Sequence, residues 1–270
     1  MTINNNYLKI LLVILTLFFT GPPSPADASL KEKDPSKDSG FLASQKASQA
    51  EKFLLIYYFD TNTDSAFKTS FDKQSRELKN KADTIRIDVK NPDESWLVDK
   101  FKVYNAPLPL VLVVAPNGAV TGSFMQSLPE DKLKSAIVSP ATQQCLLAVQ
   151  QRKLVFVCLQ GKTTQNNDVA LSGVQQFAKD PKYGKFTEIV VVDPSDKNET
   201  QLLSQLNANL KSSTATTILL SPNGQTIGKW EGATSKSDIL KSLMSMKRSC
   251  GDPKCKDPVC PLPPAKKTIK

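Results

Sequence analysis

Apolar and polar residues follow one another along this chain in a repeated order of strand-like and helix-like segments. The fully apolar segment Phe53–Phe59 has the length of a strand and suits one that is covered on both faces of a sheet. A helix is predicted before it, over Phe41–Glu51. After it the pattern predicts a helix from Asp64 to Leu78, a strand Thr84–Val89, a helix Asn91–Phe101, strands Leu110–Val114 and Ala119–Phe124, and a helix Pro129–Val138.

The same order returns in the second half of the chain, where the buried strand is Lys153–Leu159. Helices are predicted at Gln143–Gln151, Asp168–Lys179, Glu199–Leu206 and Lys236–Met246. Further strands are predicted at Glu188–Asp193, Thr216–Leu220 and Gln225–Trp230. Alternating strands and helices predict an α/β fold in which a central sheet is flanked by helices.

An internal duplication accounts for this order. Val111–Val138 reappears as Thr217–Met244 at a constant offset of 106 residues and without a gap. The sequence Pro116-Asn117-Gly118 returns as Pro222-Asn223-Gly224, and Asn-Gly between apolar runs predicts a hairpin in both places. The repeat therefore predicts two tandem domains, which we place at 42–139 and 140–247.

Upstream of this block the offset between the two copies drifts. It is 105 between Asp88 and Asp193, 104 between Asp64 and Asp168, and 101 between Ala47 and Ala148. Drift in the loops with preserved element order is what duplicated domains show. Asp64 is also a natural N-cap for the helix that follows it.

The N-terminus is expected to be a targeting segment. Ile10–Phe19 is an apolar run of about half the ~20 residues that a membrane span needs. Ala26-Asp27-Ala28 fits a cleavage site, so residues 1–28 are predicted to be a signal peptide and 29–41 a disordered leader. We expect a periplasmic or secreted protein that has no stable membrane span after cleavage.

The chain is basic, with a formal net charge of +9. From Lys247 onward there are seven basic residues and two acidic ones. In an exported protein this indicates anionic surfaces, polysaccharides or acidic partner proteins rather than nucleic acid. The alternative is that these lysines only keep a tail at 248–270 soluble.

The order helix, strand, helix, strand, helix, hairpin and final helix resembles the thioredoxin fold. In that family the hairpin is entered through a cis-proline, and Pro109 lies directly before the strand Leu110–Val114. The resemblance covers about residues 42–139 and 140–247 and implies a mixed sheet flanked by helices in each domain. It also implies a cis peptide bond at Pro109.

Thioredoxins carry Cys-x-x-Cys at the start of the helix after the first core strand, where free amides and the helix dipole lower the pKa of a thiol. Here those two positions are Asp64 and Phe67 in the first domain, and Asp168 and Leu171 in the second. An aspartate and a hydrophobic residue cannot exchange disulfides. The second domain also has Ala215 where the first has Pro109. The resemblance therefore implies two domains without thioredoxin redox chemistry.

Other catalytic classes are also disfavoured. The chain has no histidine, so Ser-His-Asp and Cys-His arrangements are excluded and the commonest metal ligand is missing. It has no glycine-rich phosphate loop. The acidic pairs Asp93-Glu94 and Glu130-Asp131 stand at predicted helix starts, where the helix dipole explains them. We expect no cofactor and no metal site within the domains.

Five cysteines remain as candidates for chemistry. Cys158 lies inside an apolar strand and is interpreted as a buried structural thiol, while Cys145 lies on the preceding helix. The other three are spaced Cys-x4-Cys-x4-Cys in the tail, with Asp-Pro in each interval: Cys250, Cys255 and Cys260.

Three interpretations of the tail stay open. One is a disulfide within the tail, with the third cysteine bonded to Cys145 or to another chain. A thiolate metal site would need a fourth ligand and a spacing unlike that of most zinc sites. A redox-active or partner-linking thiol is the third. The following Pro261–Pro264 segment is stiff and could act as a spacer or docking segment.

These observations predict a non-enzymatic exported protein in which two thioredoxin-like domains form a protein-binding or assembly module. The sequence does not identify the protein partner. The alternative is a thiol–disulfide oxidoreductase or thiolate metal binder that works through the tail cysteines.

Overall fold

The structure is a computed structural model that describes residues 35–60, 65–209 and 212–247. The chain forms two compact units, unit 1 (Met1–Leu147) and unit 2 (Ala148–Lys270). The predicted signal peptide, Asp64 and the tail with its three cysteines lie outside the described residues.

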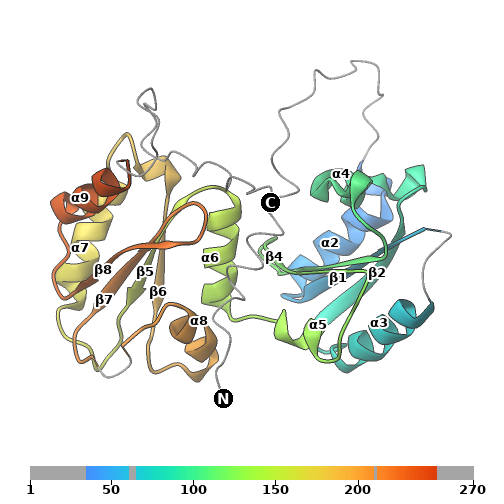
Figure 1. The fold of residues 1–270 in the computed structure, drawn as a ribbon, viewed down its shortest axis with the longest axis horizontal. Coiled ribbons are helices and arrows are strands. Elements are labelled where there is room, and N and C mark those ends of the chain that lie inside the picture. The colour runs from blue at the N-terminus through green and yellow to red at the C-terminus, as the bar shows by residue number, and fades with distance from the viewer. Residues whose placement is uncertain (1–34, 61–64, 210–211, 248–270) are drawn as a thin grey trace, which may run out of the picture. The chain divides into compact units, whose positions relative to one another are not determined.

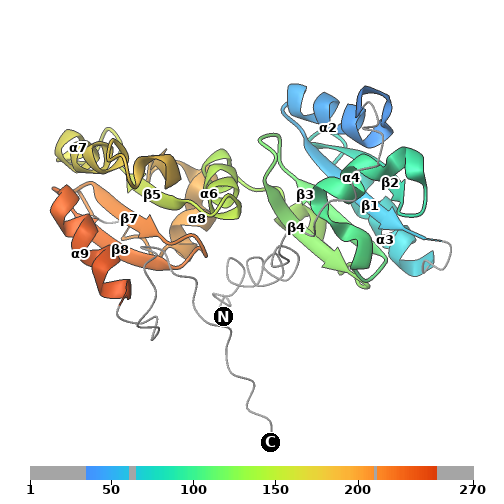
Figure 2. The ribbon, with the colours of Figure 1, turned by 90° about the horizontal axis from the view of Figure 1, so that it is seen from above.

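Unit 1 contains a four-stranded mixed sheet with the strand order β2-β1-β3-β4 (Figure 1, Figure 2). β1 pairs parallel with β2 and antiparallel with β3, and β3 forms an antiparallel hairpin with β4. The elements are η1 (Pro35–Lys37), α2 (Ser39–Gln49), β1 (Phe53–Phe59), α3 (Ser65–Glu77), β2 (Ala82–Asp88), η2 (Pro92–Glu94), α4 (Ser95–Phe101), η3 (Val103–Asn105), β3 (Leu110–Val114), β4 (Val120–Met125) and α5 (Lys132–Ser135).

The central strand β1 is buried on both faces, as its continuous apolar sequence predicts. Leu55 and Tyr57 join a core that includes side chains of α3 and α5. Ile56 and Tyr58 join a second core with side chains of α2 and α4. The buried Tyr58 hydroxyl donates a hydrogen bond to the carbonyl of Leu97, at 3.1 Å. Helices therefore cover both faces of the sheet, α2 and α4 on one side and α3 and α5 on the other (Figure 1).

Unit 2 repeats this topology with the strand order β6-β5-β7-β8. β5 is parallel to β6 and antiparallel to β7, and β7 forms a hairpin with β8. The elements are α6 (Pro140–Gln150, which crosses the boundary between the units), β5 (Leu154–Leu159), α7 (Asn167–Ala178), η4 (Gly184–Phe186), β6 (Thr187–Val192), η5 (Lys197–Glu199), α8 (Thr200–Gln205), β7 (Thr216–Leu220), β8 (Thr226–Glu231) and α9 (Lys236–Lys247). The predicted α/β class with two mixed sheets flanked by helices is confirmed.

The duplication extends to small features of the two hairpins. Each β-ladder is irregular at the same place, at Val113/Val114 and 106 residues later at Leu219/Leu220. Each turn contains a glycine with positive φ, 89° at Gly118 and 74° at Gly224. Residues with a Cβ rarely adopt this conformation, which explains why both copies keep Asn-Gly.

An ion pair is also present twice. Lys52 contacts Asp83 at 3.1 Å, and Lys153 contacts Glu188 at 3.0 Å. In each unit the lysine directly precedes the central strand and the carboxylate lies on its parallel neighbour. Because these pairs are partly exposed, each contributes about 0–1 kcal/mol, so they mark the repeat more than they stabilise it.

Residues 35–41, predicted to belong to a disordered leader, are part of unit 1. The carboxylate of Asp38 accepts hydrogen bonds from the backbone N–H groups of Gly40 at 2.7 Å and Phe41 at 3.2 Å, so α2 begins at Ser39. Its second oxygen accepts from the N–H of Trp96 at 3.0 Å. One buried carboxylate thus satisfies free amides at the starts of both α2 and α4.

The end of unit 1 also differs from the prediction. The closing helix α5 covers only Lys132–Ser135 of the predicted Pro129–Val138. Unit 1 extends to Leu147 rather than to residue 139, because Leu146 and Leu147 of α6 pack against its core. Burial therefore moves the boundary between the units into α6.

Candidate functional site

The site that a thioredoxin fold would use lies where the central strand ends and the next helix begins. In unit 1, β1 ends at Phe59 and α3 begins at Ser65. Asp64, at the first motif position, lies outside the described residues, so its role as N-cap stays a prediction. Phe67, at the second position, lies in the first turn of α3.

Phe67 is a core residue. Its side chain is 3% exposed, and its ring stacks on Tyr57 with the ring centroids 5.8 Å apart. Tyr57 also stacks on Phe71, one helical turn later, at 5.0 Å. Stacked pairs add about 0.5–1.5 kcal/mol to the free energy gained by burial. The position that the resemblance matches with the second thiol of thioredoxins is therefore filled by an apolar side chain that closes the junction of strand and helix.

In unit 2 the helix register differs from the one that the sequence predicts. Matching Asp64 with Asp168 pairs Phe67 with Leu171. The buried faces match instead at an offset of 103, between Phe67, Phe71 and Gln74 of α3 and Ala170, Val174 and Phe177 of α7. Ala170, which is 2% exposed, therefore takes the place of Phe67, and Leu171 lies beside it, half-buried.

Asp168, which the repeat pairs with the predicted N-cap Asp64, is not the N-cap of α7. Asn166, in the left-handed conformation, precedes the helix, and Asp168 lies exposed in its first turn. A carboxylate there still interacts favourably with the helix dipole. The prediction matched the copies by residue identity, whereas the burial of the helix face sets the register.

The loop before α7 is hydrogen-bonded to the segment before β7. The N–H of Gln165 donates to the carbonyl of Ser213 at 2.8 Å, and the N–H of Ala215 donates to the carbonyl of Gln165 at 2.9 Å. Thr214 donates its N–H to the hydroxyl of Ser212 at 3.2 Å, and its carbonyl accepts from that hydroxyl at 3.0 Å. The backbone of Thr214 is thus paired within unit 2.

The equivalent segment of unit 1 keeps open backbone groups. The Leu108–Pro109 peptide bond is cis, as the resemblance implies, and the carbonyl of Pro109 accepts from the N–H of Gln126 at 2.9 Å. Across the described ranges, neither the N–H nor the carbonyl of Leu108 makes a hydrogen bond. Leu108 thus presents a free donor and a free acceptor beside the cis-proline, where its counterpart Thr214 presents none.

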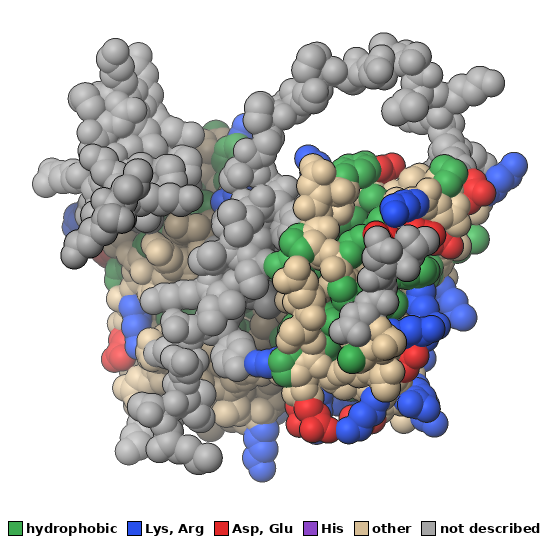
Figure 3. Space-filling view, turned by 45° about the vertical axis from the view of Figure 1, so that its right-hand side comes forward, with side chains coloured by type: hydrophobic (Ala, Val, Ile, Leu, Met, Phe, Trp, Pro, Cys, Tyr) green, Lys and Arg blue, Asp and Glu red, His purple; other side chains and the backbone are tan. Residues whose placement is uncertain are grey.

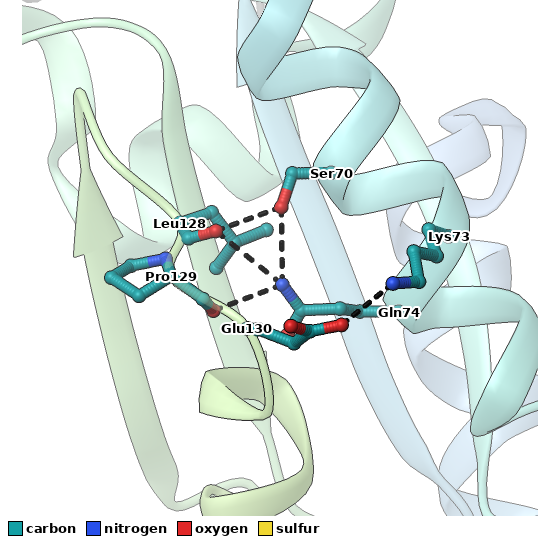
Figure 4. A network of polar contacts seen from close by, with 6 residues as sticks. All are labelled: Ser70, Lys73, Gln74, Leu128, Pro129 and Glu130. Carbon is teal, nitrogen blue, oxygen red and sulfur yellow. Dashed lines mark hydrogen bonds and ion pairs between the residues drawn. The ribbon is translucent and has the colours of Figure 1, made fainter.

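A polar network fastens α3 of unit 1 to the loop after β4 (Figure 4). It consists of Ser70, Lys73, Gln74, Leu128, Pro129 and Glu130. The buried Gln74 donates through Nε2 to the carbonyl of Pro129 at 3.0 Å and to the hydroxyl of Ser70 at 3.1 Å. Its Oε1 accepts from the N–H of Leu133 at 3.2 Å. The hydrogen bond from Leu133 to Gln74 takes the place of the side-chain N-cap that α5 lacks. The same glutamine holds α3, the helix that carries Phe67, against this loop.

Unit 2 makes the same contact without the polar network. Gly173 takes the place of Ser70, and Phe177 takes the place of Gln74. A Cβ on Gly173 would lie 1.5 Å from the carbonyl oxygen of Thr234, so only glycine allows this approach of helix and loop. Unit 1 thus holds α3 in place through polar contacts, whereas unit 2 holds the equivalent helix α7 through close packing at Gly173.

The cysteines of the described residues are both buried. Cys158 occupies on β5 the place that Tyr57 has on β1, because they pair with Thr217 and Val111 of the ungapped repeat. Burial raises the pKa of Cys158 to about 11, and the neighbouring Thr217 side chain offsets only part of this shift. Since the pKa of a free thiol is about 8.5, Cys158 is a poor nucleophile at neutral pH. Cys145 is also buried and is not bonded to Cys158.

Two further features are absent from the part of the chain that the structure describes. It contains no group of three or more His, Cys, Asp or Glu side chains that could hold a metal ion. None of its helices is long and apolar enough to cross a membrane.

Sequence reasoning found Pro109 and the substitution at Phe67 but missed the open backbone of Leu108. The signal for it was present, because the replacement of Pro109 by Ala215 restores an N–H that a proline lacks. That N–H is the group that closes the loop of unit 2 onto Gln165.

A comparison with solved structures found similarities to proteins with thioredoxin domains. Human ERp44 in its zinc-bound form is 9% identical over 76% of this chain and 58% of that chain, with a TM-score of 0.31. The first two thioredoxin domains of Naumovozyma dairenensis Eps1p are 10% identical over 80% of this chain and 92% of that chain, with a TM-score of 0.26. Thioredoxin O1 from Arabidopsis thaliana is 16% identical over 36% of this chain and 87% of that chain, with a TM-score of 0.29.

No protein-family model and no curated relative matches the sequence. The fold assignment therefore rests on the strand order and direction of each sheet, its flanking helices and the cis-proline of unit 1. By these features the chain is a tandem pair of thioredoxin-like domains.

Proposed function

We propose that this protein is an exported, redox-inactive binding module. The observation that carries the proposal is the burial of the second motif position in both units, by Phe67 in one and Ala170 in the other. A thiol–disulfide exchanger needs an accessible thiol of lowered pKa. At this position each unit has instead a side chain that belongs to its core.

The cysteines of the described residues support the same conclusion. Cys158 has a raised rather than a lowered pKa, and Cys145 is buried in α6. Neither lies at a helix start, where free amides would stabilise a thiolate. The export component rests on the apolar run at Ile10–Phe19 and the cleavage pattern that follows it.

The binding component is supported by Leu108. A chain segment that presents an unpaired N–H and C=O is suited to adding a peptide through main-chain hydrogen bonds. Pro107 is exposed beside it, and Tyr104 is 63% exposed nearby in sequence. We assign peptide binding to unit 1, because in unit 2 the hydroxyl of Ser212 already occupies the equivalent groups, the N–H and the carbonyl of Thr214.

We expect an extended peptide without free thiols to bind at Leu108. The probe is the insulin B chain with both cysteines carboxymethylated, added to the ¹⁵N-labelled full chain up to about 1 mM, where weak peptide contacts are populated. Its main-chain hydrogen bonds should shift the amide resonances of Leu108 and Gln126.

Unit 2 provides the internal control for this titration. The amides of Thr214 and Gly232, which correspond to Leu108 and Gln126, should not shift. Pro109→Ala, which installs the residue of unit 2, should weaken binding. Shifts confined to unit 2, or none at either pair of amides, would contradict the assignment.

A further inference from the structure

A small crevice lies in unit 1 between α2 and the turn that joins β3 to β4. Its volume is about 160 Å³, roughly five times the volume that a water molecule takes up in the liquid. Polar groups from three parts of the unit line it: Ser44, Ser48, Lys52, Lys100, Asn117 and Gly118. The turn follows the end of β3 and Pro109 precedes its start, so the crevice is separate from the proposed peptide edge.

The crevice carries a positive charge that is not compensated. None of its lining residues is acidic. Lys52 is paired with Asp83 at 3.1 Å, whereas Lys100 forms no ion pair with any residue in the described ranges. Elsewhere basic side chains lie close to acidic ones, as at several places on the surface in Figure 3.

The ammonium group of Lys100 is held above an aromatic ring. It lies 4.4 Å from the ring centroid of Trp96 and 5.5 Å from that of Phe101. The side chain as a whole is exposed, but partial desolvation of its ammonium lowers the pKa of Lys100. A partly desolvated cation without a counterion gains more from a bound anion than a fully hydrated lysine does.

Two hydrogen-bond donors also line the crevice. The hydroxyl of Ser44 has no partner among the residues that the structure describes. Asn117 accepts from the N–H of Ala119 through Oδ1 at 3.0 Å, which leaves its Nδ2 group to donate. The hydroxyl of Ser48 is already used, because it donates to the carbonyl of Pro116 at 2.7 Å.

Unit 2 has lost these groups although it keeps the same turn. The offsets of the repeat replace Ser44 by Cys145, Ser48 by Val149, and Lys100 by Gln205. Cys145 and Val149 are buried. The polar lining is therefore a property of unit 1 and not a requirement of the fold.

We propose that this crevice binds a carboxylate group, with Lys100 as its charge partner and Ser44 and Asn117 as hydrogen-bond donors. The volume accommodates acetate or the end of an aspartate or glutamate side chain. The carboxylate has two possible sources, an acidic segment of a partner protein or a free small carboxylate. The proposal does not depend on peptide binding at Leu108.

The test is an NMR titration of the ¹⁵N-labelled full chain with sodium acetate, with acetyl-tetraglutamate amide and with the matching tetraglutamine peptide. Both carboxylate ligands should shift the amides of Asn117 and Gly118 to saturation, and tetraglutamine should not. Tighter binding of tetraglutamate than of acetate would identify a partner's acidic segment as the source. Equal or tighter binding of acetate would identify a free carboxylate.

Variants of Lys100 test whether its charge binds the carboxylate. Lys100→Gln should weaken carboxylate binding about tenfold or more, as expected for loss of a charged hydrogen-bond partner, and Lys100→Arg should retain most of it. Lys185→Gln is the matched control, because Lys185 also lies above a ring, that of Phe186 at 4.8 Å, but in unit 2. The proposal is overturned if Lys100→Gln, with an otherwise unchanged spectrum, binds carboxylates like the unmodified chain. Inorganic phosphate shifting the same amides while carboxylates do not would also overturn it.

Discussion

Gly173→Ala is expected to destabilise unit 2 by about 3 kcal/mol or more, the upper part of the range for overpacked sites. The added methyl group would lie 1.5 Å from the carbonyl oxygen of Thr234, and this neighbour is backbone, which cannot rotate away. In an exposed helix the same change would stabilise by about 1 kcal/mol. A lower free energy of unfolding for Gly173→Ala would therefore show that α7 packs closely against the Thr234 loop, and a higher one that it does not. Urea unfolding followed through the fluorescence of Trp230 measures it.

The experiment has controls in both units. Ser172→Ala, at the exposed neighbouring position, should change the free energy of unfolding by less than about 0.5 kcal/mol. The chain has two tryptophans, Trp96 in unit 1 and Trp230 in unit 2, so Trp96→Phe makes the signal specific for unit 2. If Gly173→Ala proved as stable as the unmodified chain, the close contact of α7 with the Thr234 loop would be refuted.

Phe67→Ala is expected to destabilise unit 1 by about 3–5 kcal/mol, as found for buried aromatic residues. The change removes a side chain that is 3% exposed together with its stacking on Tyr57. Urea unfolding followed through Trp96, in a Trp230→Phe background, measures this loss.

Leu42→Ala is the matched control for Phe67→Ala. Leu42 is also an apolar helical residue of unit 1, but it is 48% exposed, so its truncation should cost less than about 1 kcal/mol. Equal effects of the two variants would show that Phe67 is not a core residue. The motif position would then be open to solvent, and the burial on which the proposed redox inactivity rests would be refuted.

Much of the fold could be predicted from the sequence, because the strongest signals were local. The seven apolar residues of β1 and the Asn-Gly turns each specify their element within a few residues. The ungapped repeat then matched β3 with β7 and β4 with β8. Strand bounds there agree with the structure to within a residue.

The candidate site was predicted less well, because it depends on contacts between distant segments. The helix register in unit 2 is set by the burial of Ala170 and Phe177, and the shared Asp64 and Asp168 suggested an alignment one residue away. The capping of α4 by Asp38 joins residues 58 apart, which no local pattern reveals. The closure of the Gln165 loop likewise depends on a backbone pairing that leaves no signature in side-chain type.

The difference between the two copies is informative for function. Each has an apolar residue at the position matched with the second motif residue. Within the described residues, the cis peptide bond lies before Pro109 of unit 1, and Leu108 has open backbone groups that its counterpart Thr214 lacks. The counterparts of Ser44, Ser48 and Lys100 in unit 2 are Cys145, Val149 and Gln205, so the polar groups of the crevice are not repeated there. We infer that unit 1 carries the binding groups.

The central claim is that both domains keep a thioredoxin-like fold without thiol–disulfide exchange, and insulin reduction tests it most directly. Aggregation of the released B chain is followed by turbidity with dithiothreitol, with and without the protein, for the full chain and for a Cys250→Ser, Cys255→Ser, Cys260→Ser variant. We predict that neither the full chain nor the triple variant accelerates insulin reduction beyond the rate with dithiothreitol alone. Acceleration that disappears in the triple variant would place redox chemistry in the tail and contradict the proposed inactivity of the protein. Acceleration that survives in it would contradict the account of the domains themselves.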